Sequence, residues 1–154
     1  RREVADRHLA RVGLARAADR RPARLSGGMQ QRVGLARAFA VDPEILLLDE
    51  PFGALDALTR RELQLQLLEV WEESQRTVIM VTHDVDEAIL LSDRVLVMSA
   101  GPESTVIADV PVDLPRPRHT VAGAGGDGGG DTDRRERYTA GLRRELLGLL
   151  QSQH

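Results

Sequence analysis

Three short apolar segments separated by helical patterns limit the folds that this 154-residue chain can adopt. The segments Ile45–Asp49, 77–82 and 94–99 are rich in Leu, Val and Ile, which is typical of β-strands. Between the first two segments, apolar residues recur at helical spacing from Asp56 to about Glu73. The first segment has no polar alternation, which predicts a strand covered on both faces. Strands alternating with helices predict an α/β fold with a mostly parallel sheet and flanking helices.

The remaining pattern divides the chain into three parts. Helices are expected over residues 3–12 and 27–41, and after Asp84, which stands with Glu87 at the spacing of a capping box. An extended, proline-containing arm is expected over residues 104–118, and the segment 122–131 holds six glycines. The predicted organisation is a domain over 1–118, a flexible glycine-rich linker over 119–133, and an amphipathic basic helix over 134–154.

Composition excludes several classes of function. The chain contains no Cys, which rules out disulfides and cysteine metal sites. A formal net charge of -3 gives no field that would attract DNA or RNA, so no nucleic-acid partner is expected. The longest apolar runs are far shorter than the roughly 20 residues that span a bilayer. We therefore expect a protein that is neither inserted nor secreted.

The run from Leu25 to Arg32 predicts a phosphate site at the start of a helix. The first N–H groups of a helix lack partners and carry a partial positive charge, and Gly27 and Gly28 would let a phosphate approach them closely. Ser26 adds a hydroxyl group. The same residues are also compatible with an ordinary capped turn, and the residues downstream favour the phosphate site.

Asp49 and Glu50 end the first predicted strand, and His83 follows the second. Neighbouring strand residues point to opposite sides, so we expect one carboxylate to face a metal and the other a water molecule. Mg²⁺ needs only one carboxylate in addition to nucleotide phosphates, which suits Asp49, and Glu50 could then deprotonate the attacking water. His83 would lie at the carboxyl edge of the sheet, where it could reach a γ-phosphate. An acidic strand end and a structural histidine are the alternative interpretations.

Together these motifs resemble those of ATP-binding-cassette (ABC) ATPases, which belong to the P-loop NTPases. Leu25 to Arg32 resembles the signature motif, Ile45 to Glu50 the Walker B strand, residues 53–56 the D-loop, and His83 the switch histidine. The resemblance covers about residues 1–118. It departs from the family pattern at Met29, where glutamine is frequent, and at Gly53, where serine is frequent.

The resemblance implies a role for each motif. Leu25, Ser26, Gly27, Gly28 and Gln30 would form the signature surface, with Ser26 and Gly28 contacting ATP held by the opposite subunit of a head-to-tail dimer. Asp49 would bind Mg²⁺, Glu50 the attacking water and His83 the γ-phosphate. Asp56 would link the two sites across the dimer. The catalytic residues would then be Glu50 and His83, and the cofactors ATP and Mg²⁺.

The chain also lacks a feature of this family. It contains no lysine, and so it cannot contain the Gly-rich Walker A loop that ends in Gly-Lys-Ser/Thr. In the family the Walker A strand lies between the strands that correspond to 77–82 and 94–99, so we expect each of these to present an unpaired edge. The chain resembles the C-terminal part of an ATPase subunit.

Within the family, residues 51–56, Trp71 and the segment 81–88 resemble those of ATPases from importers of nitrate, sulfonate and taurine. Three further segments favour nitrate: 92–94, 101–103 and 115–118. This resemblance implies integral membrane permease subunits as partners, a solute-binding protein as an indirect partner, and a peripheral location on the cytoplasmic face of the membrane. Two alternatives remain open: an inactive remnant that only docks to partners, and a non-transport ABC ATPase.

Overall fold

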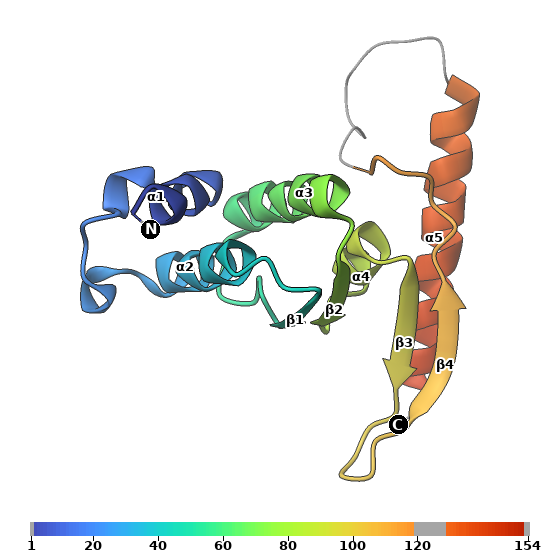
Figure 1. The fold of residues 1–154 in the computed structure, drawn as a ribbon. Helices are drawn as coiled ribbons and strands as arrows, with labels where there is room; N and C mark the ends of the chain where they lie inside the picture. The colour runs from blue at the N-terminus through green and yellow to red at the C-terminus, as the bar shows by residue number, and fades with distance from the viewer. Residues whose placement is uncertain (1, 119–128, 153–154) are drawn as a thin grey trace. The chain divides into compact units, whose positions relative to one another are not determined.

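The computed structural model describes residues 2–118 and 129–152, which form two compact units (Figure 1). Unit 1 covers Arg1–Thr82 and unit 2 covers His83–His154. Each unit contains helices and its own two-stranded sheet, so the α/β class predicted from the sequence is confirmed. In the described part of the chain, no helix is long and apolar enough to cross a membrane.

Unit 1 contains three α-helices and a parallel pair of strands. The helices are α1 (Arg2–Arg11), α2 (Gly27–Ala40) and α3 (Ala57–Ser74), and α1 packs on α2. Strand β1 (Ile45–Asp49) pairs with β2 (Thr77–Val81) in parallel, and the register runs from Ile45 opposite Thr77 to Asp49 opposite Val81. The carboxyl ends of the two strands therefore meet at one edge, as predicted.

Polar side chains fix where the helices of unit 1 begin. The Ser26 hydroxyl accepts a hydrogen bond from the Met29 N–H at 3.3 Å, and the Asp56 carboxylate accepts one from the Thr59 N–H at 3.0 Å. Both residues are therefore N-caps, which satisfy N–H groups that a helix cannot satisfy internally. The predicted starts of α2 and α3 are confirmed.

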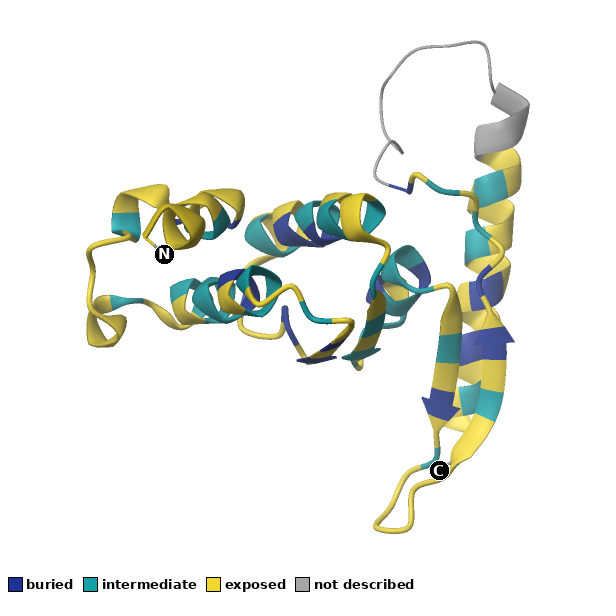
Figure 2. Cartoon of the chain, in the orientation of Figure 1, coloured by how far each residue is buried: buried dark blue, intermediate teal, exposed yellow. Residues whose placement is uncertain are grey.

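The expectation that β1 is covered on both faces is wrong. Its burial alternates: Leu46 and Leu48 are buried, whereas Ile45 and Leu47 are 58% and 71% exposed. On β2, Ile79 and Val81 are likewise exposed. Figure 2 colours the chain by burial. The described helices of unit 1 bury only one face of this sheet, and the continuous apolar sequence of β1 does not reveal this.

Unit 2 is an antiparallel strand pair covered by helices. Strand β3 (Arg94–Met98) pairs with β4 (Val106–Pro111), and α4 (Val85–Leu91) and α5 (Gly129–Gln151) complete the unit. The arm predicted over 104–118 thus contains a strand. Strands β2 and β3 belong to different sheets and do not pair with each other. Each therefore has one edge without a partner strand in its two-stranded sheet, as the sequence predicts. A cluster of buried side chains forms the core of unit 2: Ile89, Val97, Val110, Val112, Leu142 and Leu146.

Helix α5 starts earlier than the sequence suggests. We predicted a linker up to residue 133, but the helix begins at Gly129, and the predicted linker residues 119–128 lie outside the described part. Near this start, Arg137 Nε donates to Asp133 Oδ1 at 3.2 Å, one helical turn apart, a pair that favours helix. Leu142 and Leu146 are buried, so this helix covers the core of unit 2.

Arg118 is the main polar anchor of unit 2. Its side chain is only 4% exposed, and its Nη1 donates to the Ser92 carbonyl at 2.6 Å, just beyond α4. Its Nη2 donates to the carbonyls of Val112 at 3.1 Å and Leu114 at 3.0 Å. Burial is the main cause that lowers the pKa of Arg118, although an arginine remains charged. One guanidinium therefore joins the end of α4 to the chain that leaves β4.

We expect Arg118→Met to destabilise unit 2 by at least about 2 kcal/mol, because several buried carbonyls would lose a charged donor. The matched control is Arg134→Met, on the exposed surface of α5, which should change stability by less than about 0.5 kcal/mol. Chemical denaturation of both variants, followed by circular dichroism, measures the difference. Equal stability of the two variants would show that the buried guanidinium does not anchor this unit.

Candidate functional site

The N-terminus of α2 presents an open surface formed by Ser26, Gly27 and Gly28. Ser26 and Gly27 are exposed, and a Cβ added to Gly27 would meet no atom within 4 Å. The 14-residue helix behind them supplies a positive dipole end and unpaired N–H groups. This arrangement can bind an anion such as a phosphate.

Gly28 lies against the loop that follows β1. A Cβ at this position would stand 3.1 Å from Leu55 Cδ2 and 3.7 Å from the Ala54 carbonyl oxygen. Leu55 is buried, so it could not move away freely. The glycine at this position is therefore required for close packing in addition to any approach by a ligand.

Gln30 has a structural contact that the sequence did not suggest. Its Nε2 donates to the carbonyls of Pro22 at 3.3 Å and Leu25 at 3.2 Å, in the loop that precedes α2. The amide nitrogen of this predicted cofactor-binding residue thus holds the loop in front of the helix. Leu25 itself is half-buried.

Glu50 has a strained backbone. Its φ is +41°, a left-handed conformation that costs of order 1–3 kcal/mol for a residue other than glycine. The strand alternation on which we based the separation of the two carboxylates does not extend to Glu50, because β1 ends at Asp49 and Glu50 has a left-handed φ. The Glu50 N–H donates to the Val81 carbonyl at 2.9 Å, and the Gly53 N–H donates to the Glu50 carbonyl at 3.2 Å.

Sequence reasoning missed the role of Gln31. Its Nε2 donates to the Glu50 carbonyl at 2.9 Å, and its Oε1 accepts from the Ala54 N–H at 3.2 Å. The side chain thus joins α2 to the loop that carries Glu50. Its position three residues after Gly28 places it on the same helix face, and this was the available signal in the sequence. The sequence could not identify its partner, because Glu50 lies 19 residues away.

Asp49 and Asp56 are both exposed at the ends of this loop. Asp49 is the last residue of β1, and Asp56 caps α3. Hydrogen bonds from the backbone and side chain of Thr59 lower the pKa of Asp56 below its ordinary value. The cap is thus strongest when the carboxylate is ionised.

His83 is the first residue of unit 2, and it is exposed. The residue after it, Asp84, caps α4 and accepts hydrogen bonds from the N–H groups of Asp86 at 2.9 Å and Glu87 at 3.1 Å. The structure thus brings the signature residues, Asp49, Glu50 and Asp56 together within unit 1, and places His83 at the start of the other unit.

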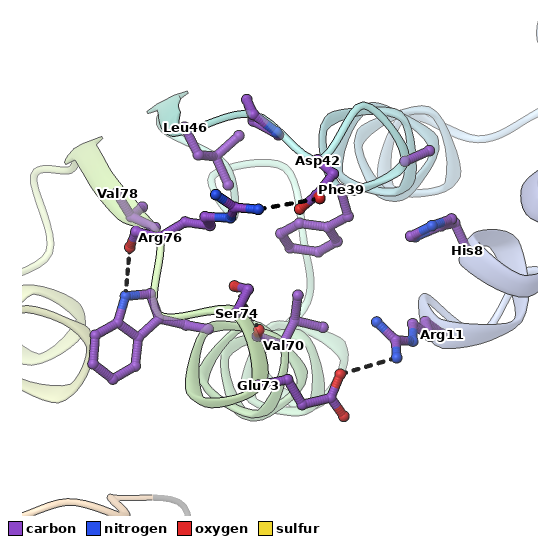
Figure 3. A pocket seen from close by; sticks show the side chains of 13 residues that line it. His8, Arg11, Phe39, Asp42, Leu46, Val70, Glu73, Ser74, Arg76 and Val78 are labelled. Atoms are coloured by element: carbon purple, nitrogen blue, oxygen red, sulfur yellow. Dashed lines mark hydrogen bonds and ion pairs between the residues drawn. The ribbon is translucent and has the colours of Figure 1, made fainter.

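A cavity of about 330 Å³ lies elsewhere in unit 1, between α1 and the ends of α2 and α3 (Figure 3). Two ion pairs border it: Arg11 with Glu73 at 3.1 Å, and Arg76 with Asp42 at 3.2 Å. Burial, then the charges of neighbouring arginines, lowers the pKa of His8, which also lines the cavity. None of the predicted site residues lines this cavity.

Comparison with known proteins agrees with this geometry. The ABC transporter family matches residues 1–53. A solved ATP-binding cassette, described as a dimeric post-hydrolysis state bound to ADP and Pi, is 36% identical with a TM-score of 0.65. The match covers 71% of this chain and 46% of that one. The chain belongs to the ABC transporter ATPase family.

Within this family, the chain is similar to importers of small anions. It is 55% identical to the nitrate import ATP-binding protein NrtD of Synechococcus elongatus over 122 residues, which are 78% of this chain and 44% of that protein. It is 54% identical to the nitrate transport protein NasD of Klebsiella oxytoca over 121 residues, or 79% of this chain and 46% of that protein. The chain spans less than half the length of these relatives.

The lowered pKa of Asp56 predicts how stability depends on pH. A carboxyl group whose pKa is depressed by folding stabilises the fold above its ordinary pKa, and this contribution is lost as the pH falls through the folded value. Asp56→Asn keeps the cap without a titratable group. We therefore expect the wild type to lose stability relative to this variant between about pH 5 and about pH 3, measured by urea unfolding. A difference that does not change with pH would contradict the assignment.

Proposed function

We propose that this chain supplies the signature surface and the hydrolytic carboxylate of an ABC importer ATPase. One observation carries the proposal: the open N-terminus of α2 and a left-handed Glu50 lie in one unit and are joined by Gln31. The family match supports it, because both features lie within the matched residues 1–53. The importer would take up a small inorganic anion such as nitrate.

The N-terminus of α2 would bind the γ-phosphate of ATP. Ser26 and Gly28 would contact it, with Leu25 and Gly27 shaping the surface and Gln30 holding the preceding loop. Because this surface supplies one side of a site, the ATP would be held mainly by a second ATPase subunit in a head-to-tail dimer. The solved relative in a dimeric state bound to ADP and Pi supports this arrangement.

Asp49 and Glu50 would be the carboxylates that act in ATP hydrolysis. Among the described residues, no three His, Asp or Glu side chains gather as a metal site. The residues present fit Mg²⁺ only in its usual nucleotide-bound form, in which one carboxylate and the phosphates supply the ligands. The exposed Asp49 would be this carboxylate. When bound, Mg²⁺ neutralises phosphate charge.

Glu50 would orient and deprotonate the attacking water. Its direction is set by backbone hydrogen bonds to Val81 and Gly53. His83 would contact the γ-phosphate on the side of its own subunit, and Asp56 would join the two sites across the dimer. Permease subunits in the membrane, and indirectly a solute-binding protein, would be the partners at the cytoplasmic face.

The relatives support the nitrate class. One is described as a nitrate import ATP-binding protein and one as a nitrate transport protein. A further relative from Synechocystis, 57% identical over 118 residues, is described as a bicarbonate transport ATP-binding protein. Nitrate and bicarbonate are small monovalent anions, so we favour this class of solute over sulfonates or taurine. Uptake assays with each anion, in cells that depend on the subunit, test this choice.

We expect Glu50→Gln to leave ATP binding intact and to lower turnover by about 10²- to 10⁴-fold, because loss of a general base has this effect. The assay protein is a chimaera in which this chain replaces the part it matches of the Synechococcus nitrate relative. Glu44→Gln, at an exposed position just before β1, is the matched control and should be unchanged. Turnover near the wild-type rate in Glu50→Gln would refute the assignment.

The absence of lysine favours a second candidate, a chain that docks to partners without binding nucleotide alone. We expect the 154-residue chain by itself to bind Mg-ATP more weakly than micromolar, because Ser26 and Gly28 offer only the γ-phosphate side of a site. Isothermal titration calorimetry measures this. Micromolar affinity would show that the chain contains a complete site, and inactivity of the chimaera would favour the docking function.

A further inference from the structure

The side-chain amide of Gln31 makes two hydrogen bonds to opposite ends of one loop. Its Nε2 donates to the Glu50 carbonyl at 2.9 Å, and its Oε1 accepts from the Ala54 N–H at 3.2 Å. An amide has distinct donor and acceptor ends, and here the partners fix which end points where. Gln31 is half-buried, and its two partner residues, Glu50 and Ala54, are exposed.

The loop that Gln31 holds is the one that orients Glu50. Glu50 has a left-handed φ of +41°, which the surrounding contacts must maintain. Its N–H is bound to the Val81 carbonyl, and its own carbonyl accepts from both Gly53 N–H and Gln31 Nε2. Of these three hydrogen bonds, only the one from Gln31 comes from a side chain, and this side chain belongs to α2.

A second contact joins the same helix face to the same loop. Gly28, three residues before Gln31, has so little room that a Cβ would stand 3.1 Å from Leu55 Cδ2. The face of α2 formed by these two residues therefore lies along residues 50–55. A shift of the N-terminus of α2 would move the loop as well.

The side-chain hydrogen bonds of the neighbouring glutamine go to a different loop. Gln30 Nε2 donates to the carbonyls of Pro22 and Leu25, on the other side of the helix start. Gln30 and Gln31 thus have the same side chain and adjacent positions, but they hold different loops. Gln30 therefore gives a matched control for the hydrogen-exchange test of the tether.

We propose that Gln31 is a positioning residue that couples phosphate binding at the start of α2 to the orientation of Glu50. The proposal rests on the proposed ATPase function. Gln31 touches neither nucleotide nor water in this scheme and acts through the backbone of Glu50. A phosphate that engages Ser26 and Gly28 would thereby set the general base of the same chain, which in a head-to-tail dimer belongs to the other ATP site.

The tether itself is tested on the present chain by amide hydrogen exchange. Gln31→Met removes both hydrogen bonds with little change in size, so the Ala54 N–H should exchange about tenfold faster or more. Gln31→Glu keeps an acceptor for this N–H, so Ala54 should retain protection, whereas the donor to the Glu50 carbonyl is replaced by a carboxylate oxygen that repels it. Gln30→Met should leave Ala54 unchanged. Unchanged exchange at Ala54 in Gln31→Met would overturn the tether.

The coupling is tested by steady-state ATP hydrolysis in the chimaera. Both Gln31→Met and Gln31→Glu should lower kcat about tenfold with little change in the KM for ATP, because the lost bond orients the general base. A structural role alone would not act equally in Gln31→Glu, which retains the bond to Ala54. The activity control is Glu44→Gln, at the exposed position before β1, which should keep its kcat.

The outcomes separate the two proposals. If the wild-type chimaera hydrolyses ATP and both Gln31 variants keep their kcat, the coupling is wrong and the ATPase function stands. If both Gln31 variants raise KM without lowering kcat, Gln31 serves binding and the coupling is again wrong. If the wild-type chimaera has no activity, the ATPase proposal fails and the coupling with it, while hydrogen exchange still reports whether the tether exists.

Discussion

The left-handed turn at Glu50 is the constraint on which the site in unit 1 depends. The residue before a proline is already restricted, so the local sequence does not favour this turn. It is maintained by contacts from elsewhere: the Val81 carbonyl, which continues the β1–β2 ladder by one residue, and the Gln31 amide from α2. Phe52, 1% exposed, anchors the chain just beyond. The orientation of Glu50 is therefore a property of the packed unit.

The exposed face of the β1–β2 sheet is the other main feature of unit 1. Four large apolar side chains, Ile45, Leu47, Ile79 and Val81, are each more than half exposed. Apolar patches of this kind mark contact surfaces, because burial stabilises by about 25 cal/mol per Å². The same strands end at the predicted site, so whatever covers this face would also stiffen the edge that carries Asp49 and Glu50.

Sequence alone predicted most of the elements and failed on their environment. Periodicity and the caps Ser26, Asp56 and Asp84 indicated the helices and three of the strands in the correct order. Strand β4 was missed, because its residues were assigned to an extended arm. The prediction that both faces of β1 are buried was wrong. An apolar sequence is compatible with burial on both faces, but it does not show which elements pack on each face. The Gln31 tether was missed because hydrogen bonds 19 and 23 residues apart leave no local pattern. The turn at Glu50 was missed for the same reason.

The side-chain chemistry of each helix N-cap determines whether that residue can also bind an anionic ligand. The Ser26 hydroxyl accepts from the Met29 N–H through a lone pair, and its own hydrogen remains able to donate to a phosphate oxygen. An ionised aspartate only accepts, and its charge repels phosphate. Asp56 and Asp84 therefore contribute by fixing where α3 and α4 begin. Of the three caps, Ser26 alone combines the start of a helix with a donor, which is why the anion surface is expected at α2.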